Sequence, residues 1–175
     1  MSDPATAALQ ALVEEAVKKS GMLWIALPGL PQPRGAWHVW HEGAAYVLTG
    51  GEGEQPLPGL PEADRVTVTV RSKDKGGRLV SFTAAVDEVR PGTELWDAVT
   101  PLLAKERLNA AAHSEQVERW AHESYVIRLT PTGEITEAPG GHRDDYAAVR
   151  PVPTPATTVG RNPFMVGGKG RKADR

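Results

Sequence analysis

The stretch RVTVTVR at residues 65–71 and the stretch RLVSFTAAVDEV at residues 78–89 decide the fold class. Valine alternates with a polar residue throughout the first stretch, which is the pattern of a β-strand with one buried and one exposed side. The second stretch also gathers apolar side chains on one side, at Val80, Phe82, Ala84 and Val86. Residues 73–77 between them are lysine, aspartate and glycine, which favour a turn. The two stretches therefore predict a pair of antiparallel strands.

Other strands are predicted on both sides of this pair. Glu42-Gly43 separates two β-prone runs and predicts a second hairpin. Thr130-Pro131 follows the last run and is expected to end it, because proline cannot donate a hydrogen bond to a neighbouring strand. The predicted strands are residues 22–27, 36–41 and 44–49 before the pair, and residues 125–129 after it.

Residues 4–20 predict the clearest helix, because small and apolar residues recur there at helical spacing. Asp3 is expected to cap this helix, and Pro4 suits its first position. Gly21 is expected to end it.

A second helical region is predicted to open at Thr93. Thr100-Pro101 is expected to restart that helix as a new cap and first-turn proline, because proline inside a helix removes a hydrogen bond. Ser114 is expected to cap another short turn. The order of one helix, about five strands, further helices and a strand predicts an α+β barrel with antiparallel pairing.

The domain is expected to span residues 1–138, followed by a Pro/Gly-rich basic tail over residues 139–175. The tail has no apolar periodicity and is predicted to be disordered. It carries seven Lys/Arg and three Asp, so the net charge of −2 divides into +4 for the tail and −6 for the domain. A domain of that sign repels phosphate backbones, which argues against nucleic-acid binding by it.

Composition excludes several kinds of site and predicts the compartment. The 175 residues include no cysteine, which excludes disulfides, thiolate metal sites and a cysteine nucleophile. No apolar run approaches the roughly 20 residues of a membrane helix, and the first residues lack a secretory signal. We therefore expect a cytoplasmic protein that does not enter a membrane.

The histidines and glycines do not form a recognisable catalytic motif. His38 and His41 are three residues apart on a predicted strand, so their side chains point to opposite faces and no shared metal site is expected. Gly50-Gly51-Glu52-Gly53 lacks the lysine of a phosphate loop, and no nucleophile elbow is present. The sequence therefore identifies no catalytic residue.

Two groups of residues are candidates for ligand binding. Arg71-Ser72-Lys73 follows a predicted strand and offers donors that suit a phosphate or a carboxylate. The same residues also suit a solvated hairpin tip. Trp37 and Trp40 are predicted to lie on opposite faces of one strand, so one of them can stack on a ring ligand or on a second subunit while the other packs in the core.

Residues 7–131 resemble the flavin-binding split-barrel superfamily, which includes pyridoxamine 5′-phosphate oxidase and actinobacterial flavin- and deazaflavin-dependent reductases. The resemblance lies in the order of the elements and in several local stretches. These stretches are WHVWHEGAAYVLTG at residues 37–50, residues 66–73, 80–86 and 94–109, and the final strand at residues 124–131.

The resemblance implies a six-stranded antiparallel split barrel that forms a homodimer and binds two cofactors between its subunits. Carried over residue by residue, it implies that FMN, or alternatively a deazaflavin coenzyme, contacts Thr49 and Gly50 and then the Arg71-Ser72-Lys73 group. Trp40 is the candidate for contact with the ring.

This chain departs from the oxidase pattern at residues 51–55. Gly51-Glu52-Gly53-Glu54-Gln55 stands where the oxidases have a Ser-Arg-Lys stretch, and carboxylates disfavour a bound phosphate. Two functions therefore stay open. One is a flavin- or deazaflavin-dependent oxidoreductase, and the other is a split-barrel binding or scaffold protein without a cofactor.

Overall fold

The computed structural model describes residues 4–72, 77–107 and 113–141. The expected cap Asp3, the candidate ligand residue Lys73 and nearly all of the predicted tail lie outside the described residues. The elements are α1 (Pro4–Lys19), β1 (Leu23–Ala26), β2 (Arg34–Ala36), β3 (Val39–His41), β4 (Ala44–Thr49), β5 (Arg65–Arg71), β6 (Arg78–Val89), α2 (Glu94–Glu106), α3 (His113–Glu123) and β7 (Tyr125–Glu137).

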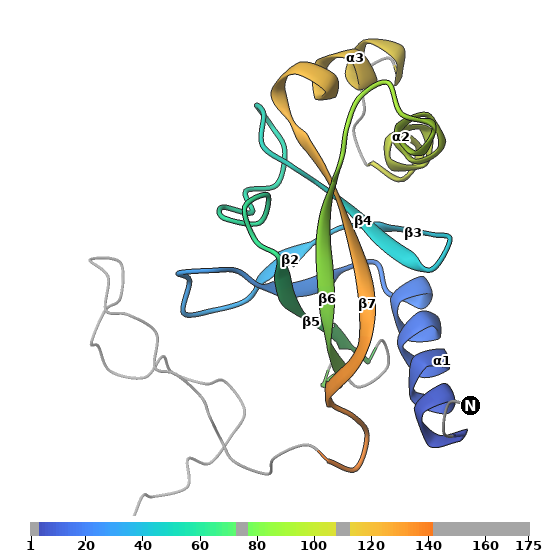
Figure 1. Ribbon diagram of the computed structural model, residues 1–175. Coiled ribbons are helices and arrows are strands. Elements are labelled where there is room, and N and C mark those ends of the chain that lie inside the picture. The colour runs from blue at the N-terminus through green and yellow to red at the C-terminus, as the bar shows by residue number, and fades with distance from the viewer. Residues whose placement is uncertain (1–3, 73–76, 108–112, 142–175) are drawn as a thin grey trace, which may run out of the picture. The chain divides into compact units, whose positions relative to one another are not determined.

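The strands form one antiparallel sheet of seven strands in the order β2-β1-β5-β6-β7-β4-β3. The predicted pair is confirmed: β5 and β6 have the expected bounds and lie antiparallel, with Val68 opposite Phe82. β6 and β7 have 12 and 13 residues and run side by side through the middle of the sheet (Figure 1). They set the length of the sheet and connect its two ends.

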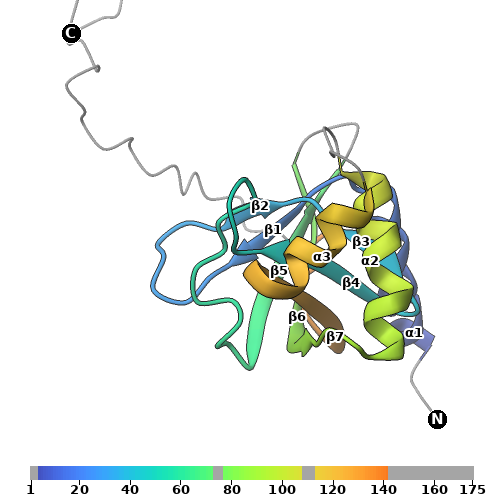
Figure 2. The same ribbon diagram turned by 90° about the horizontal axis from the view of Figure 1, so that it is seen from above.

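The sheet is curled, because one of its faces encloses a core to which six of its strands contribute. Val13 and Val17 of α1 also pack into this first core. A second core lies on the other face beneath α2 and α3, which cover the same end of the molecule (Figures 1 and 2). β4 serves both cores, since Val47 belongs to the first and Tyr46 and Leu48 belong to the second. All of β4 is therefore buried.

The number of strands corrects the expectation of six. The run expected over residues 36–41 is divided at Trp37 and His38, so that β2 pairs with β1 while β3 pairs with β4. β2 and β3 are the two edges of the sheet, and these two residues carry the chain from one edge to the other. The backbone of Trp37 bonds there to the side chain of Gln55 instead of a neighbouring strand. The chain itself therefore connects the two edge strands of the curled sheet.

The hairpin predicted at Glu42-Gly43 is confirmed, with β3 and β4 paired antiparallel across it. Both turn residues have positive φ, 44° for Glu42 and 79° for Gly43. Two such residues in succession are typical of the two-residue turns that match the twist of a β-hairpin.

The predicted helix start at Thr93 is confirmed: Thr93 is the N-cap of α2, and its hydroxyl accepts a hydrogen bond from the backbone N–H of Trp96 at 3.2 Å. The expected restart at Pro101 is wrong, because α2 is continuous through this residue. Pro101 and Asp97 are both exposed, so the carbonyl that loses its donor can meet water. Ser114 lies within α3, which has 11 residues, and not at the start of a short turn.

The last strand is longer than predicted and does not end at Pro131. β4 pairs with β7 only as far as Leu129, so the later residues of β7 have a partner strand on one side only. Pro131 lies in this edge portion, next to a register irregularity opposite Phe82 and Ala84. Edges and irregularities are where a sheet tolerates proline.

Candidate functional site

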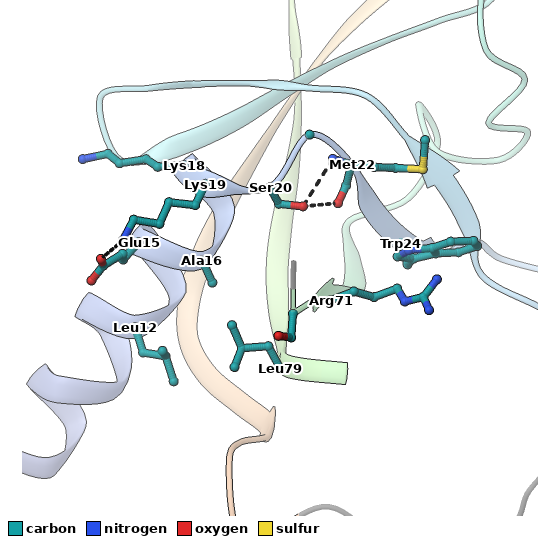
Figure 3. A pocket seen from close by; sticks show the side chains of 12 residues that line it. Leu12, Glu15, Ala16, Lys18, Lys19, Ser20, Met22, Trp24, Arg71 and Leu79 are labelled. Atoms are coloured by element: carbon teal, nitrogen blue, oxygen red, sulfur yellow. Dashed lines mark hydrogen bonds and ion pairs between the residues drawn. The ribbon is translucent and has the colours of Figure 1, made fainter. Parts of the chain in front are cut away.

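A groove of about 1090 Å³ lies between the C-terminal half of α1 and the ends of β1 and β5 (Figure 3). Trp24 and Met22 form part of its wall, and 48% of Met22 is exposed. Its other apolar lining residues are Leu12, Ala16 and Leu79. Ligand sites are usually concave and combine apolar surface with polar groups, and this groove combines five apolar residues with charged and hydroxyl-bearing side chains.

Arg71 and Ser72, both predicted as ligand residues, line this groove. The guanidinium carbon of Arg71 lies 5.7 Å from the centroid of the Trp24 ring, within the range of a cation–π contact. The register explains the contact, because Trp24 in β1 lies opposite Thr69, two residues before Arg71 in β5. The backbone N–H of Ser72 donates to the carbonyl of Gly77 at 2.8 Å and fixes the start of the turn. The groove therefore combines an aromatic face with a cation.

Two lysines at the end of α1 also line the groove, but each is paired along its own helix. Lys18 lies 2.6 Å from Glu14, and Lys19 lies 2.5 Å from Glu15. The contact with Lys19 lowers the pKa of the Glu15 carboxyl. These pairs are exposed and contribute little to stability, and the carboxylates reduce the positive potential that the lysines add to the groove.

Thr49 and Gly50 lie in a different environment, at the start of the loop over residues 50–57. The buried hydroxyl of Thr49 donates to the carbonyl of Gln55 and accepts from the N–H of Leu57, both at 3.0 Å. The carbonyl of Gly50 accepts from the hydroxyl of Ser124 at 2.8 Å. Both residues thus hold the loop in place through contacts within the chain.

The register shows that one chain does not bring these two groups together. Thr49 lies opposite Tyr125, and the neighbouring Val126 lies opposite Val89 at the end of β6. Arg71 lies opposite Arg78 at the beginning of β6. A 12-residue strand spans roughly 36 Å at about 3.3 Å per residue. The predicted ligand residues therefore occupy opposite ends of the sheet.

Trp40 occupies a third position. It is half-buried, packs against the first core, and lines a cavity of about 280 Å³ together with Phe82 and Ile135. Trp37 packs against the second core but belongs to no strand, so the prediction that both tryptophans lie on one strand is wrong. Neither contributes to the groove beside Arg71.

Sequence reasoning identified Glu54 only as a departure, whereas the structure shows it at the centre of a polar cluster. Its side chain is 1% exposed, and Oε1 accepts hydrogen bonds from Arg107 and from the indole N–H of Trp120, the latter at 2.9 Å. Arg119 lies 3.5 Å from the same oxygen. No local signal points to this cluster, because its members are 53 to 66 residues away from Glu54.

The residues around Thr49 and Gly50 do not fit a bound phosphate. The Thr49 hydroxyl makes two hydrogen bonds within the loop, and the Glu54 carboxylate already accepts from nearby arginines. The groove fits better, since Arg71, Ser72 and an exposed part of Trp24 line one open space.

His38 is a further buried titratable group. Its Nε2 lies 3.0 Å from the carbonyl of Val17 and can donate to it. Burial lowers the pKa of His38, and the hydrogen bond to Val17 opposes this effect only in part. Within the described residues, no three His, Asp or Glu side chains are grouped so as to hold a metal ion. None of the described helices has the length and apolar composition to cross a membrane.

Comparison with known families and with curated protein sequences finds no match. Solved structures do match. ChuZ of Campylobacter jejuni is 10% identical with a TM-score of 0.51 and covers 71% of this chain, which spans about half of ChuZ (53%). HutZ, the heme storage protein of Vibrio cholerae, is 18% identical with a TM-score of 0.48, over 70% of this chain and 89% of HutZ. An F420 reductase is 17% identical with a TM-score of 0.47, over 68% of this chain and 92% of the reductase.

ChuZ, whose TM-score exceeds 0.5, has the same fold as this chain over 71% of it. The resemblance seen in residues 7–131 is therefore confirmed at the level of the fold. The curled antiparallel sheet with three helices agrees with it, and the number of strands is the correction described above.

Proposed function

We propose that this protein binds a phosphorylated flavin or deazaflavin in the groove beside Arg71 and acts with it as an oxidoreductase. The observation that carries the proposal is the meeting of Arg71 and Ser72 with the ring of Trp24 in one groove. A planar anionic cofactor needs both an aromatic or apolar surface and phosphate donors. Sequence resemblance to flavin-binding split barrels supports the same class of ligand.

The groove residues have distinct roles in this proposal. Trp24 and Leu79 provide apolar surface for a ring system, while Arg71 and the Ser72 hydroxyl bind phosphate. Lys73 follows directly in the sequence and is proposed as a third donor. The bound cofactor would supply the hydride chemistry, and the protein would hold and orient it.

The proposal includes a homodimer. Trp40 does not line the groove beside Arg71 within one chain, whereas a second copy can bring its own Trp40 toward that groove. Light scattering at micromolar concentration tests this arrangement, and we expect a particle of about twice the 18.8 kDa chain mass. A strictly monomeric particle would contradict a site shared between subunits.

One observation favours a binding protein without a cofactor. At the loop over residues 50–57, Thr49 and Gln55 make hydrogen bonds within the chain, and one oxygen of Glu54 pairs with the nearby arginines. A chain that had lost its cofactor would need such internal partners.

Titration of the purified protein separates the two functions. FMN, FAD and a deazaflavin are added in parallel, and binding is followed by cofactor fluorescence and by thermal unfolding. We expect saturable binding of at least one of the three, with a rise in Tm. Absence of binding to all three by a folded protein would favour the cofactor-free alternative.

A further inference from the structure

The Glu54 cluster has the donor arrangement of a binding site for a small anion. Groups from two parts of the chain converge on one oxygen: Arg107 after α2 and Trp120 of α3 donate hydrogen bonds to it, and Arg119 of α3 forms an ion pair with it. Charged hydrogen bonds from guanidinium groups are the usual means of holding phosphate and carboxylate groups. The ligand in this structure is the chain's own carboxylate.

Charge and burial distinguish this cluster from an ordinary surface ion pair. The Glu54 side chain is 1% exposed and that of Arg107 is 16% exposed. Two guanidinium groups face one carboxylate, so the net charge of the cluster is positive both in the presence and in the absence of Glu54. Because a buried charge is costly unless it is paired, removal of Glu54 would leave the largely buried guanidinium of Arg107 without its partner, while that of Arg119, 44% exposed, stays hydrated.

The two carboxylate oxygens of Glu54 differ in their hydrogen bonds. Oε2 is buried and has no hydrogen-bond partner in the part of the chain that the structure describes. The described donors therefore contact a single oxygen of the carboxylate. A small oxyanion that presents one oxygen to these groups can make the same contacts.

We propose that Arg107, Arg119 and the indole N–H of Trp120 form an oxyanion-binding site that the chain keeps filled with the Glu54 carboxylate. Free carboxylate or phosphate does not bind there in the native protein, because Glu54 competes from within the same chain at high effective concentration. The site becomes available to an external oxyanion when the Glu54 carboxylate is absent. It is separate from the groove beside Arg71, which lies at the other end of β6.

Rescue of the full-length Glu54→Ala variant by added anions tests the proposal. Thermal unfolding is measured in sodium formate, in sodium phosphate and in sodium chloride at matched ionic strength. We expect the variant to unfold at a lower temperature than the native protein in chloride. Formate or phosphate should raise its Tm by about 3–6 °C above the value in chloride, as expected for an anion near ten times its Kd. The native protein measures the general effect of each salt, including phosphate at the groove beside Arg71, and the shift of the variant should exceed that effect by this amount.

Matched variants connect the effect to the cluster. Glu52→Ala removes an exposed carboxylate from the same loop and should show no shift beyond that of the native protein. Glu54→Ala/Arg107→Gln should lose the rescue, because a main donor is gone. Rescue by formate alone indicates a site limited to planar carboxylates, and rescue by phosphate as well indicates one that accepts tetrahedral anions; either supports the proposal.

The same experiment can overturn the inference. Equal Tm values of Glu54→Ala in all three salts, or rescue that persists in the double variant, would contradict an oxyanion site at these donors. If Glu54→Ala does not fold in chloride, its recovery from urea is compared in the three salts. Recovery no better in formate or phosphate than in chloride would also contradict it. These outcomes leave cofactor binding at Arg71 unaffected, since that site is tested by a different titration.

Discussion

The side-chain amide of Gln55 pairs with both backbone polar groups of Trp37. The Trp37 N–H donates to Oε1 at 3.0 Å, and Nε2 donates to the Trp37 carbonyl at 3.1 Å. Gln55 thus substitutes for a neighbouring strand at the position where the chain passes from one edge of the sheet to the other. A single side chain allows the sheet to curl without leaving backbone groups unpaired.

Gln55→Ala should lower the free energy of unfolding by about 2–4 kcal/mol, because it leaves two partly buried backbone groups without a partner. For a domain of this size the Tm should fall by roughly 4–12 °C. Thermal unfolding followed by circular dichroism measures the change. Gln32→Ala alters an exposed glutamine and serves as the control. Equal stability of the two variants would show that the pairing with Trp37 is replaceable by water.

Arg71→Gln should weaken binding of a phosphorylated flavin or deazaflavin roughly 10- to 100-fold, since a charged hydrogen bond contributes about 1.5–3 kcal/mol. The stability of the protein without cofactor should barely change, because Arg71 is exposed. Arg65→Gln is the matched control at the other end of the same strand. Fluorescence titration gives the Kd values. If Arg71→Gln binds the cofactor with unchanged affinity, the cofactor binds elsewhere on the protein.

Acid should destabilise the protein through His38. Burial holds the pKa of the folded-state imidazole below its ordinary value of about 6.5, so the unfolded chain takes up the proton first. The contribution of His38 is present above pH 6.5 and is lost as the pH falls through the lower folded-state pKa. His38→Gln should therefore reduce the loss of Tm between pH 7 and pH 5.

The control for this pH dependence is His122→Gln, which changes an exposed histidine at the end of α3. Urea unfolding at several pH values measures the slope of stability with pH. An identical slope in native protein and His38→Gln would assign the acid sensitivity to other groups.

A chain that ends at Ala138 should fold with nearly the same Tm as the full chain. The sequence from Pro139 onward lacks the apolar periodicity needed to build a core. Thermal unfolding of the two chains tests this prediction. A Tm lower by more than about 8 °C, equivalent to two kcal/mol or more, would show that the terminal segment stabilises the domain.

The sequence predicted those parts of the fold that depend on consecutive residues. β5 and β6 have the predicted bounds because alternation of apolar and polar side chains is a local property of a half-buried strand. The helix start at Thr93 and the Glu42-Gly43 turn were predictable for the same reason. Of the candidate site, Arg71 and Ser72 were predicted by residue type and position, and their pairing with Trp24 was not.

Only the tertiary structure decided the features that depend on neighbours distant in sequence. Whether a strand continues through Trp37 depends on where the sheet edges meet, and whether proline is tolerated at Pro131 depends on which side of β7 lacks a partner. Glu54 in sequence resembles an exposed loop carboxylate, and it is buried because Arg107 and Trp120 reach it from elements more than 50 residues away. Local patterns determine which residues form strands and helices, whereas burial and pairing depend on which elements meet in space.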